Sequence, residues 1–444
     1  MNVLFALASL AVSTVAGFAI ARVFSSGLSM AEKIAWGFAL GLLLQAGIDV
    51  GLLAARLTPG PKKIVAAEIA LALAAFSIPR HWIPRGSAIT KEGPGIYRLF
   101  WLIAAVGIVL FGIVALSSPM WTTDFLAIWG LKGKIIFATA SIPKRLFHDP
   151  ALVWSHPEYP MLLPLTFASL AAELRVWDDL AMAILYPALQ AATALAVGGF
   201  LSRRVSRASG AIGASLTAVC FPLYSAGNIG LAEIPLALGL VLLSCAALDA
   251  VDECAPGTRF RLLAASFFCS ATKQEGTLFA LLVAAGLAVV GRRGTRFARR
   301  AWLWAAGPAL VHGIGWRLLR GPVPRPYVDL SLLEPRRWGE LVAREFQVVK
   351  HVSTVEIPGA ALAITAVAIF FILTRSSFAD WLVLPLGAQA LAYAAFCAIS
   401  AFGAVWWLEA SYSRIIVTLL PALTLVLGAR LPVRDRRAAE SIPR

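Results

Sequence analysis

The chain has 444 residues, of which 59% are hydrophobic and 14% are charged, and its formal net charge is +15. A soluble globular domain is closer to half apolar and a quarter charged, so this composition excludes an ordinary soluble protein. Apolar runs near twenty residues recur along the chain, and each is long enough to cross about 30 Å of hydrocarbon. The sequence therefore predicts an all-α, polytopic membrane helical bundle.

The positive charge is explained by membrane topology. Arginine clusters lie between predicted spans, where the positive-inside rule expects the Lys and Arg of cytoplasmic loops. No long soluble tail is available to bind a nucleic acid, so we expect no nucleic-acid partner. The five cysteines form no C-x-x-C pair, and four of them lie in apolar runs, which is typical of buried thiols. The first apolar run lacks a basic leader, which predicts a retained helix rather than a signal peptide.

In chain order, apolar runs predict about thirteen transmembrane helices. These are expected at 3–21, 34–54, 64–79, 99–118, 179–201, 209–226, 232–248, 262–272, 277–291, 301–319, 358–374, 380–400 and 414–430. The run at 161–173 is shorter and flanked by prolines. Its length favours an interfacial or partly inserted helix over a full span.

Charge then orients the predicted bundle. The arginines at 203–207, the segment 292–300 with five Arg and no acid, and the basic tail 431–444 should all be cytoplasmic. They fall on one side only if 262–291 is a hairpin that is broken at 273–276. We therefore expect a hairpin there rather than one long helix.

With this topology the chain divides into three parts. Residues 1–98 form N-terminal transmembrane helices, 99–430 form the core, and 431–444 form the cytoplasmic tail. The exoplasmic side carries the first large loop, 119–178, with its juxtamembrane helices, and a second loop at 320–356. Polar residues concentrate in the first loop, so the chemistry is expected at this membrane face.

The first loop begins with a candidate catalytic acid and an amphipathic stretch. Asp124 follows a predicted helix end and precedes FLAIWGLKGKIIF. Lys132 and Lys134 are expected to face water or lipid phosphate. The apolar residues of this stretch are then expected to lie on the membrane, namely Phe125, Ile128, Trp129, Ile135 and Ile136.

Further polar residues are predicted to approach the same membrane face. His156, Glu158 and Tyr159 belong to the segment HPEYP, whose prolines favour an extended turn. The others lie at helix ends. Glu233 opens a helix, Lys273 and Glu275 lie at the predicted hairpin break, and Arg414 begins the last helix.

Several of these residues also have a purely structural interpretation, whereas Arg414 lies at the outer face, where the positive-inside rule does not explain it. Asp124 is a favoured helix N-cap residue, and Glu233 suits a helix start through its charge alone. Lys132 and Lys134 are as well explained as snorkelling cations, and Lys273 with Glu275 as a pair that makes the hairpin tolerable. His156 is typical of a turn, and Trp406 and Trp407 are typical of an aromatic belt.

Five motifs occur in a fixed order: DFLAIWGLKGK, HPEYPMLLPL, GLAEIPLAL, ATKQEG and SYSRIIVTLLPAL. This pattern resembles bacterial membrane glycosyltransferases of the GT-C superfamily. It is similar in particular to the family 39 group, which includes protein O-mannosyltransferases and the aminoarabinose transferase of lipid A modification. The resemblance covers roughly residues 99–430, and it is carried by the set of motifs rather than by any one of them.

The resemblance implies transfer of a sugar from a polyprenyl-phosphate donor on the outer face of the membrane. Asp124 would be the catalytic base toward an acceptor hydroxyl, in a direct displacement that inverts the anomeric centre. The departing phosphate needs cations, and the candidates are Lys132, Lys134, Lys273 and Arg414. The acceptor or second-acid candidates are Glu158, Tyr159, Glu233, His156 and Glu275.

The resemblance leaves some roles open. Glu233 stands where the pattern leads us to expect Asp, which weakens its assignment as second acid or metal ligand. Some relatives use a divalent cation, Mg²⁺ or Mn²⁺, and Asp124 with Glu233 or Glu158 are the residues able to hold one. The acceptor would be a lipid, a glycan or a protein.

The resemblance implies a multi-pass protein of the plasma (inner) membrane whose active site faces the exoplasmic or periplasmic side. Two other classes of function remain as alternatives. A lipid-linked sugar flippase or secondary transporter would bind substrate near the membrane midplane, on interrupted helices. A non-catalytic assembly subunit would tolerate amides at the acidic positions.

Overall fold

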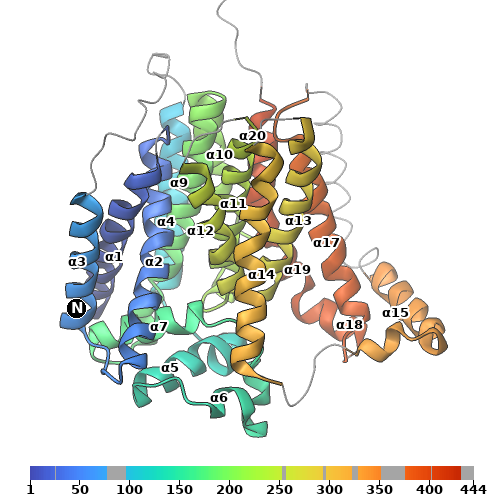
Figure 1. The fold of residues 1–444 in the computed structure, drawn as a ribbon, viewed down its shortest axis with the longest axis horizontal. Helices are drawn as coiled ribbons and strands as arrows, with labels where there is room; N and C mark the ends of the chain where they lie inside the picture. Colours follow the sequence, from blue (N-terminus) through green and yellow to red (C-terminus); the bar gives the residue numbers. More distant parts are fainter. Residues whose placement is uncertain are drawn as a thin grey trace, which may run out of the picture.

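The computed structural model describes residues 1–25, 27–77, 97–252, 257–293, 297–322, 329–351, 376–401 and 403–431. Every regular element within these ranges is helical, and none of them is a β-strand. Most of the longer helices run side by side, while shorter helices lie across one end of the bundle (Figure 1). The predicted all-α bundle is therefore confirmed at this level, whereas the predicted helix at 358–374 lies outside the described residues.

The first half of the chain forms long helices, then a cluster of short ones, then long helices again. They are α1 (Asn2–Phe24), α2 (Met30–Ala54), α3 (Pro61–Ser77), α4 (Tyr97–Ala115), the π-helical η2 (Phe125–Trp129), α5 (Gly130–Thr139), α6 (Arg145–His148), η3 (Pro150–Ser155), α7 (Leu162–Leu174), α8 (Asp179–Met182), α9 (Leu185–Arg204) and α10 (Arg207–Ala218).

The second half repeats this alternation of long and short elements. It contains η4 (Ala226–Asn228), α11 (Glu233–Asp252), α12 (Gly257–Thr272), α13 (Gln274–Val290), η5 (Gly291–Arg293), η6 (Ala298–Arg300), α14 (Ala301–Arg320), η7 (Leu330–Leu333), η8 (Pro335–Arg337), α15 (Trp338–His351), η10 (Asp380–Leu382), α17 (Val383–Ala398), α18 (Ala404–Trp407), η11 (Leu408–Tyr412), α19 (Ser413–Ile416), η12 (Val417–Leu419) and α20 (Leu420–Ala429).

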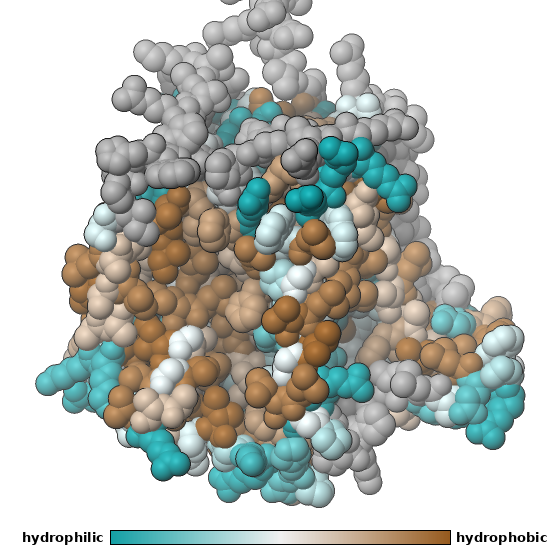
Figure 2. Space-filling model, in the orientation of Figure 1, coloured by the Kyte–Doolittle hydropathy of each residue, from teal (hydrophilic) through white to brown (hydrophobic). Residues whose placement is uncertain are grey.

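Within the described ranges, six helical segments are long and apolar enough to cross a membrane. They are Asn2–Phe24, Met30–Ala54, Tyr97–Ala115, Asp179–Arg204, Glu233–Val251 and Asp380–Ala398. Shorter apolar helices occur at Leu162–Leu174, Gln274–Val290 and Ser413–Ala429. These spans indicate a multi-pass membrane protein, and the larger number of crossings remains a prediction. Figure 2 shows the matching surface, with a broad apolar belt between more hydrophilic ends.

The predicted hairpin break is confirmed. Lys273 alone separates α12 from α13, in an extended conformation with φ −157° and ψ 155°. At one end of α12, Arg261 pairs with Asp249 near the end of α11. At its other end, Lys273 pairs with Glu233 at the start of α11. Helices α11 and α12 are therefore antiparallel.

Helix α13 then runs back toward the end of the bundle where Arg261 pairs with Asp249. Gly286 in its second half packs against Trp381, and Arg430 pairs with Asp380 beside that tryptophan. The turn after α13, which carries Arg292, therefore lies at the same end as the α9–α10 turn (Figure 1). The first large loop, with α5, α6 and α7, lies at the opposite end.

Helix α11 lies at the centre of the core. It packs against α9, α12, α13, α14 and α20, so its side chains are covered on all sides. The N-terminal helices join this core without a gap, since α2 packs against α9 and α7. Between α1 and α2 the backbones approach closely: a Cβ at Gly17 would lie 2.0 Å from the carbonyl oxygen of Gly37. Small residues permit such contacts between membrane helices.

The short helix α7 has the limited length predicted for 161–173, but its burial does not support the predicted interfacial or partly inserted position. Its 13 residues span about 20 Å, which is less than the roughly 30 Å of hydrocarbon. In Figure 1 it lies across the end of the bundle that carries α5 and α6. Its apolar residues are buried against α1, α2 and α5. Helix α7 is therefore a platform inside the fold rather than a lipid-facing segment.

Candidate functional site

Five charged side chains form a continuous series of ion pairs, which we call the charge chain. Arg414 Nη2 lies 2.9 Å from Oδ2 of Asp124, and Arg414 Nε lies 3.1 Å from Oε1 of Glu233. The same Glu233 oxygen accepts a hydrogen bond from Lys273 Nζ at 3.2 Å. Lys273 Nζ also lies 2.9 Å from Oε1 of Glu275. Two cations thus alternate with three carboxylates.

The members of the charge chain come from four separate elements. Asp124 precedes η2, Glu233 begins α11, Lys273 and Glu275 flank the start of α13, and Arg414 lies in α19. The sequence analysis had placed all five at one membrane face. The structure brings their charged groups into contact, while their roles in catalysis remain proposals.

A glycine allows Asp124 to come near the start of α11. Gly230 has a φ of 94°, and a Cβ there would lie 2.6 Å from the Cβ of Phe125. A larger residue would therefore be strained in its backbone and would collide with the residue after Asp124. Thr122 Oγ1 adds a hydrogen bond to the carbonyl oxygen of Ile229 at 3.1 Å. These contacts hold the loop before η2 against the segment that leads into the start of α11.

The side chains of the charge chain differ in solvent exposure, from almost fully buried to partly exposed. The side chain of Glu233 is 1% exposed and that of Lys273 is 5% exposed. Asp124 and Arg414 are 27% and 24% exposed. Asp124 makes no side-chain capping hydrogen bond to η2, so the simple N-cap interpretation is wrong. An external ligand would therefore meet Asp124 and Arg414 first.

The HPEYP segment forms an aromatic and polar wall beside the charge chain. The ring of Tyr159 stacks on Trp129 with centroids 5.2 Å apart, and on His156 at 4.5 Å. Lys273 Nζ lies 5.9 Å from the centroid of the Tyr159 ring. His156 Nδ1 lies 2.7 Å from Oε1 of Glu158. All three acceptor candidates in this segment therefore lie in or next to the site.

Helices α13 and α14 hold the HPEYP segment in place. The carbonyl oxygen of Glu158 accepts hydrogen bonds from Gln274 Nε2 at 3.0 Å and from Trp316 Nε1 at 2.9 Å. Burial raises the pKa of Tyr159 well above its usual value, so its hydroxyl stays protonated near neutral pH. Tyr159 can therefore donate a hydrogen bond but is no general base.

The expected orientation of Lys132 is wrong. Its side chain is fully buried, and Nζ donates a hydrogen bond to the carbonyl oxygen of His156 at 2.5 Å. Burial lowers the pKa of Lys132 to about 7, and nearby Glu158 opposes that shift. Lys134 is exposed on the same helix and takes no part in the ion pairs of the charge chain. The two lysines therefore have different environments.

The predicted membrane-facing residues of this stretch are also corrected. Four of them lie in the protein core rather than on lipid, namely Phe125, Ile128, Trp129 and Ile136. The cause is local geometry. Residues Phe125–Trp129 are π-helical, which shifts the phase between this segment and α5, and α5 packs on α7. Leu126, at 57% exposed, points outward instead.

Two polar residues of α17 that were not among the predicted site residues also lie near the site. Gln389 and Tyr393 lie four positions apart, on one face of the helix, and both are buried. Gln389 Nε2 donates to the carbonyl oxygen of Glu275 at 3.1 Å. The signal was present, because two polar groups at this spacing in an apolar span indicate a polar contact inside the bundle.

Several buried polar atoms around the charge chain lack a hydrogen-bond partner among the described residues. They are the acceptors Glu158 Oε2, Glu233 Oε2 and Glu275 Oε2, the hydroxyl oxygen of Tyr393, and one donor, Arg414 Nε, whose approach to Glu233 is an ion pair without hydrogen-bond geometry. Unsatisfied buried groups are costly, so each calls for a partner such as water or a ligand hydroxyl. The site therefore offers an excess of hydrogen-bond acceptors.

The proposed divalent cation does not fit this arrangement. The guanidinium of Arg414 contacts both candidate ligands, Asp124 and Glu233. In the described part of the chain, no group of three or more His, Cys, Asp or Glu is arranged to hold a metal ion. Mg²⁺ and Mn²⁺ favour a shell rich in oxygen ligands, and a cationic side chain occupies the place between these carboxylates.

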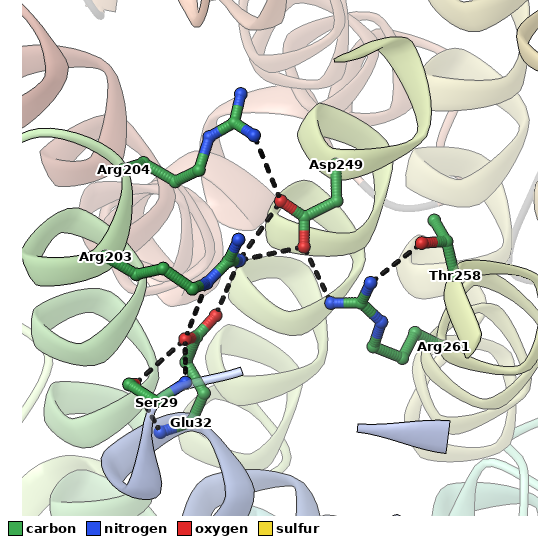
Figure 3. A network of polar contacts seen from close by, with 7 residues as sticks. All are labelled: Ser29, Glu32, Arg203, Arg204, Asp249, Thr258 and Arg261. Carbon is green, nitrogen blue, oxygen red and sulfur yellow. Dashed lines mark hydrogen bonds and ion pairs between the residues drawn. The ribbon is translucent and has the colours of Figure 1, made fainter. Parts of the chain in front are cut away.

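A second charged network, drawn in Figure 3, joins the start of α2 to the ends of α9 and α11 and so lies at the opposite end of the bundle. Arg203 Nη2 lies 2.9 Å from Oε1 of Glu32 and 2.8 Å from Oδ2 of Asp249. Arg261 Nη1 lies 2.6 Å from the same Asp249 oxygen. Arg204 also approaches Asp249, at 3.8 Å. This network ties α2 to α9, α11 and α12, and its acids are fully paired, so its role is structural.

The sequence analysis did not identify this second network. Arg203 and Arg204 were assigned to a cytoplasmic loop, whereas both lie in the last turn of α9. Glu32 and Asp249 lie far apart along the chain, and only the packing of α2 beside α9 brings them together. Comparisons with protein families, with curated proteins and with solved structures found no match for this chain.

Proposed function

We propose that this protein is an integral membrane glycosyltransferase. It would transfer a sugar from a polyprenyl-phosphate donor to an acceptor hydroxyl at the exoplasmic face, with inversion at the anomeric carbon. The charge chain is the observation that carries this proposal. It combines an accessible carboxylate with an adjacent guanidinium at one end of a membrane bundle, in agreement with the motif pattern that resembles GT-C enzymes.

In this proposal Asp124 is the general base. The acceptor oxygen attacks the anomeric carbon, the bond from that carbon to the phosphate oxygen breaks, and the bonding electrons leave with the phosphate. The acceptor proton passes to a carboxylate oxygen of Asp124. The partial exposure of Asp124 supports this role, because an acceptor must come within hydrogen-bond distance of it.

Arg414 would bind the donor phosphate. Guanidinium groups make short, charge-assisted hydrogen bonds with phosphate oxygens and stabilise the charge that develops on the leaving group. Arg414 already contacts Asp124, so a bound phosphate would compete with this carboxylate for the guanidinium. Loss of that contact would leave Asp124 a stronger proton acceptor in the presence of donor than in its absence.

The remaining candidates support these two residues. Lys273 balances the charge of Glu233 and Glu275, and this holds Arg414 at its position through Glu233. Tyr159, His156 and Glu158 would contact the acceptor, since they form the wall beside Asp124. Lys132 is too buried for direct contact with a phosphate and would support the backbone of His156.

A lipid-linked sugar flippase or secondary transporter is the second candidate. It is favoured by the single-residue break between α12 and α13, which places Lys273 against the buried carboxylate of Glu233. Transporters use interrupted helices and buried charges to bind their substrates. The partial exposure of Asp124 and Arg414 at one end of the bundle favours the enzyme instead.

A turnover assay tests the proposed enzymatic activity, with a substitution elsewhere in the same loop as the control. The full chain in lipid nanodiscs is incubated with a panel of radiolabelled polyprenyl-phosphate sugars and acceptors, as wild type, Asp124→Asn and Asp149→Asn. Asp149 lies in the same loop but caps η3 through the backbone N–H of Ala151, outside the charge chain. We expect turnover in wild type and Asp149→Asn, and a loss of about 10²–10⁴-fold in Asp124→Asn.

Two other results would contradict the proposed glycosyltransferase activity. Full activity of Asp124→Asn at equal protein level would show that Asp124 is not the general base. Donor binding without turnover, followed by movement of the labelled sugar lipid between leaflets of a vesicle, would establish the transporter.

A further inference from the structure

A cavity of about 310 Å³ lies apart from the charge chain, between the α2–α3 turn, α5 and α7. Its walls are largely apolar and include Ile136, Phe137, Ala168 and Ala172. Asp49 also lines it. This volume is at the lower end of the roughly 300–1,000 Å³ typical of small-molecule sites.

Asp49 is the distinctive group of this cavity. It is 1% exposed, and Ser169 donates a hydrogen bond to its Oδ2. Its other oxygen, Oδ1, has no hydrogen-bond partner among the described residues. A buried carboxyl oxygen without a partner is costly, and the cavity is the space from which a ligand would provide one.

The surroundings of Asp49 select for a positive charge. Two further acidic side chains, Glu68 and Glu173, lie near Asp49. Glu173 accepts a hydrogen bond from Gln45, and Glu68 accepts one from Ser13. None of these three acids has an ion-pair partner within the described ranges. Only Asp49 of the three lines the cavity, so a cation bound there would pair with Asp49.

The outer part of the cavity has the opposite charge. Arg175 is exposed and lines it, at the end of α7. Lys62 and Lys63 are exposed beside the lining residue Pro61, and Lys63 Nζ donates to the carbonyl oxygen of Thr58. The α2–α3 turn is also at the end of the bundle that carries α5 and α7 (Figure 1). An inner carboxyl group with outer cations suits a ligand that carries an ammonium and an anionic group.

We propose that this cavity binds a phosphoethanolamine group. Its primary ammonium would pair with Oδ1 of Asp49, and its phosphate would remain near Arg175, Lys62 and Lys63. A phospholipid headgroup and the free soluble compound share this chemistry. The proposal does not depend on glycosyl transfer, because none of these residues belongs to the charge chain.

Lipid titration followed by native mass spectrometry tests the proposal. The delipidated full chain in detergent is titrated with dioctanoyl phosphatidylethanolamine, with dioctanoyl phosphatidylglycerol, and with soluble O-phosphoethanolamine. The glycerol lipid keeps the phosphate and tails but lacks the ammonium. Wild type should bind the ethanolamine lipid at least about tenfold more tightly than the glycerol lipid, because only the former gains the buried charge pair.

Two isosteric variants assign the effect to one carboxyl group. Asp49→Asn should bind both lipids with nearly equal affinity. Glu68→Gln should keep the wild-type preference, since Glu68 is as buried as Asp49 but does not line the cavity. Thermal unfolding of each variant confirms that it is folded, and the two-lipid comparison in wild type holds even if a variant fails to fold.

The outcomes distinguish a phospholipid ligand from the free soluble compound, and some of them would contradict the proposal. Displacement of the lipid by O-phosphoethanolamine would identify the headgroup alone as sufficient, whereas lipid binding without such displacement would identify the phospholipid. Equal affinity of wild type for the two lipids would overturn the proposal. A wild-type preference in Asp49→Asn, or its loss in Glu68→Gln, would do the same.

Discussion

Arg414 Nη2 lies 2.9 Å from Oδ2 of Asp124, which joins the last helices of the chain to the loop after α4. This contact makes Arg414 a neighbour of the proposed base and of the buried Glu233 at once. Asp124 alone could serve as a base in many surroundings. Its pairing with a partly exposed guanidinium is what suits a reaction in which a phosphate departs.

Arg414→Gln should therefore reduce sugar transfer by about 10²–10³-fold, because the variant loses a charge-assisted contact with the leaving group. Arg414→Lys should be intermediate, since lysine keeps the charge but cannot contact Asp124 and Glu233 with a planar fork. Single-turnover rates with saturating donor measure the effect. Arg336→Gln is the control, because Arg336 is 78% exposed and its ion pair is with Glu334, outside the charge chain. Retention of more than half the wild-type rate in Arg414→Gln would exclude this role.

Glu233→Gln should destabilise the fold, because Lys273 and Arg414 lose a buried carboxylate. Removal of one partner from a buried ion pair typically costs about 3–5 kcal/mol. We expect the lower end of that range, since Glu275 still pairs with Lys273. Denaturant titration in detergent measures the free energy of unfolding.

A double-mutant cycle checks that the effect comes from this pair. The loss in the Glu233→Gln, Lys273→Met double variant should be smaller than the sum of the two single losses, because each single variant already breaks the pair between these side chains. Additive losses in the double variant would show that the two side chains do not interact.

Lys132 should make stability depend on pH. Its pKa is lowered to about 7 in the fold from 10.5, so the folded protein disfavours its charged form. The destabilisation is complete below pH 7 and is relieved as the pH rises toward 10.5, because the unfolded chain then binds more protons than the folded one.

Lys132→Met should therefore raise the melting temperature relative to wild type more at pH 6.5 than at pH 9.5. Tryptophan fluorescence during heating provides the measurement. Lys134→Met, on the exposed side of the same helix, should show no such trend. A difference between Lys132→Met and wild type that stays constant across this pH range would contradict the prediction.

Gly276→Ala should weaken the α12–α13 hairpin. A Cβ at Gly276 would lie 2.1 Å from the carbonyl oxygen of Cys269, which is too close for any real contact. Gly387→Ala is the matched control, because a Cβ at that position in α17 meets nothing within 4 Å. The control should be neutral or more stable by up to about 1 kcal/mol, since alanine favours a helix. A melting temperature of Gly276→Ala equal to that of the control would refute the prediction.

The sequence predicted the large-scale features well, because they follow from length and apolarity. The hairpin break at Lys273 followed from charge distribution alone, and the short helix at 161–173 followed from its length. The convergence of Asp124, Glu233 and Arg414 also followed from topology, since each lies at a helix end that faces the same way.

The finer geometry could not be read from the sequence. The π-helical turn before α5 changes which residues point inward, so Lys132 and Phe125 are buried although a regular amphipathic helix would expose one and place the other on lipid. The pairing of Glu32 with Arg203 depends on how α2 packs beside α9, and nothing local to either residue encodes it.

Helix α11 carries a member of each charged network, Glu233 at its start and Asp249 near its end. The interval of sixteen positions (249 − 233) corresponds to a rise of about 24 Å along the helix. This is shorter than the roughly 30 Å of hydrocarbon in an ordinary bilayer. A flat bilayer of that thickness cannot leave both networks outside its acyl region, so the surrounding lipid must thin or one network must lie below the headgroups. The protein should therefore be more stable in lipids with short acyl chains than in those with long ones.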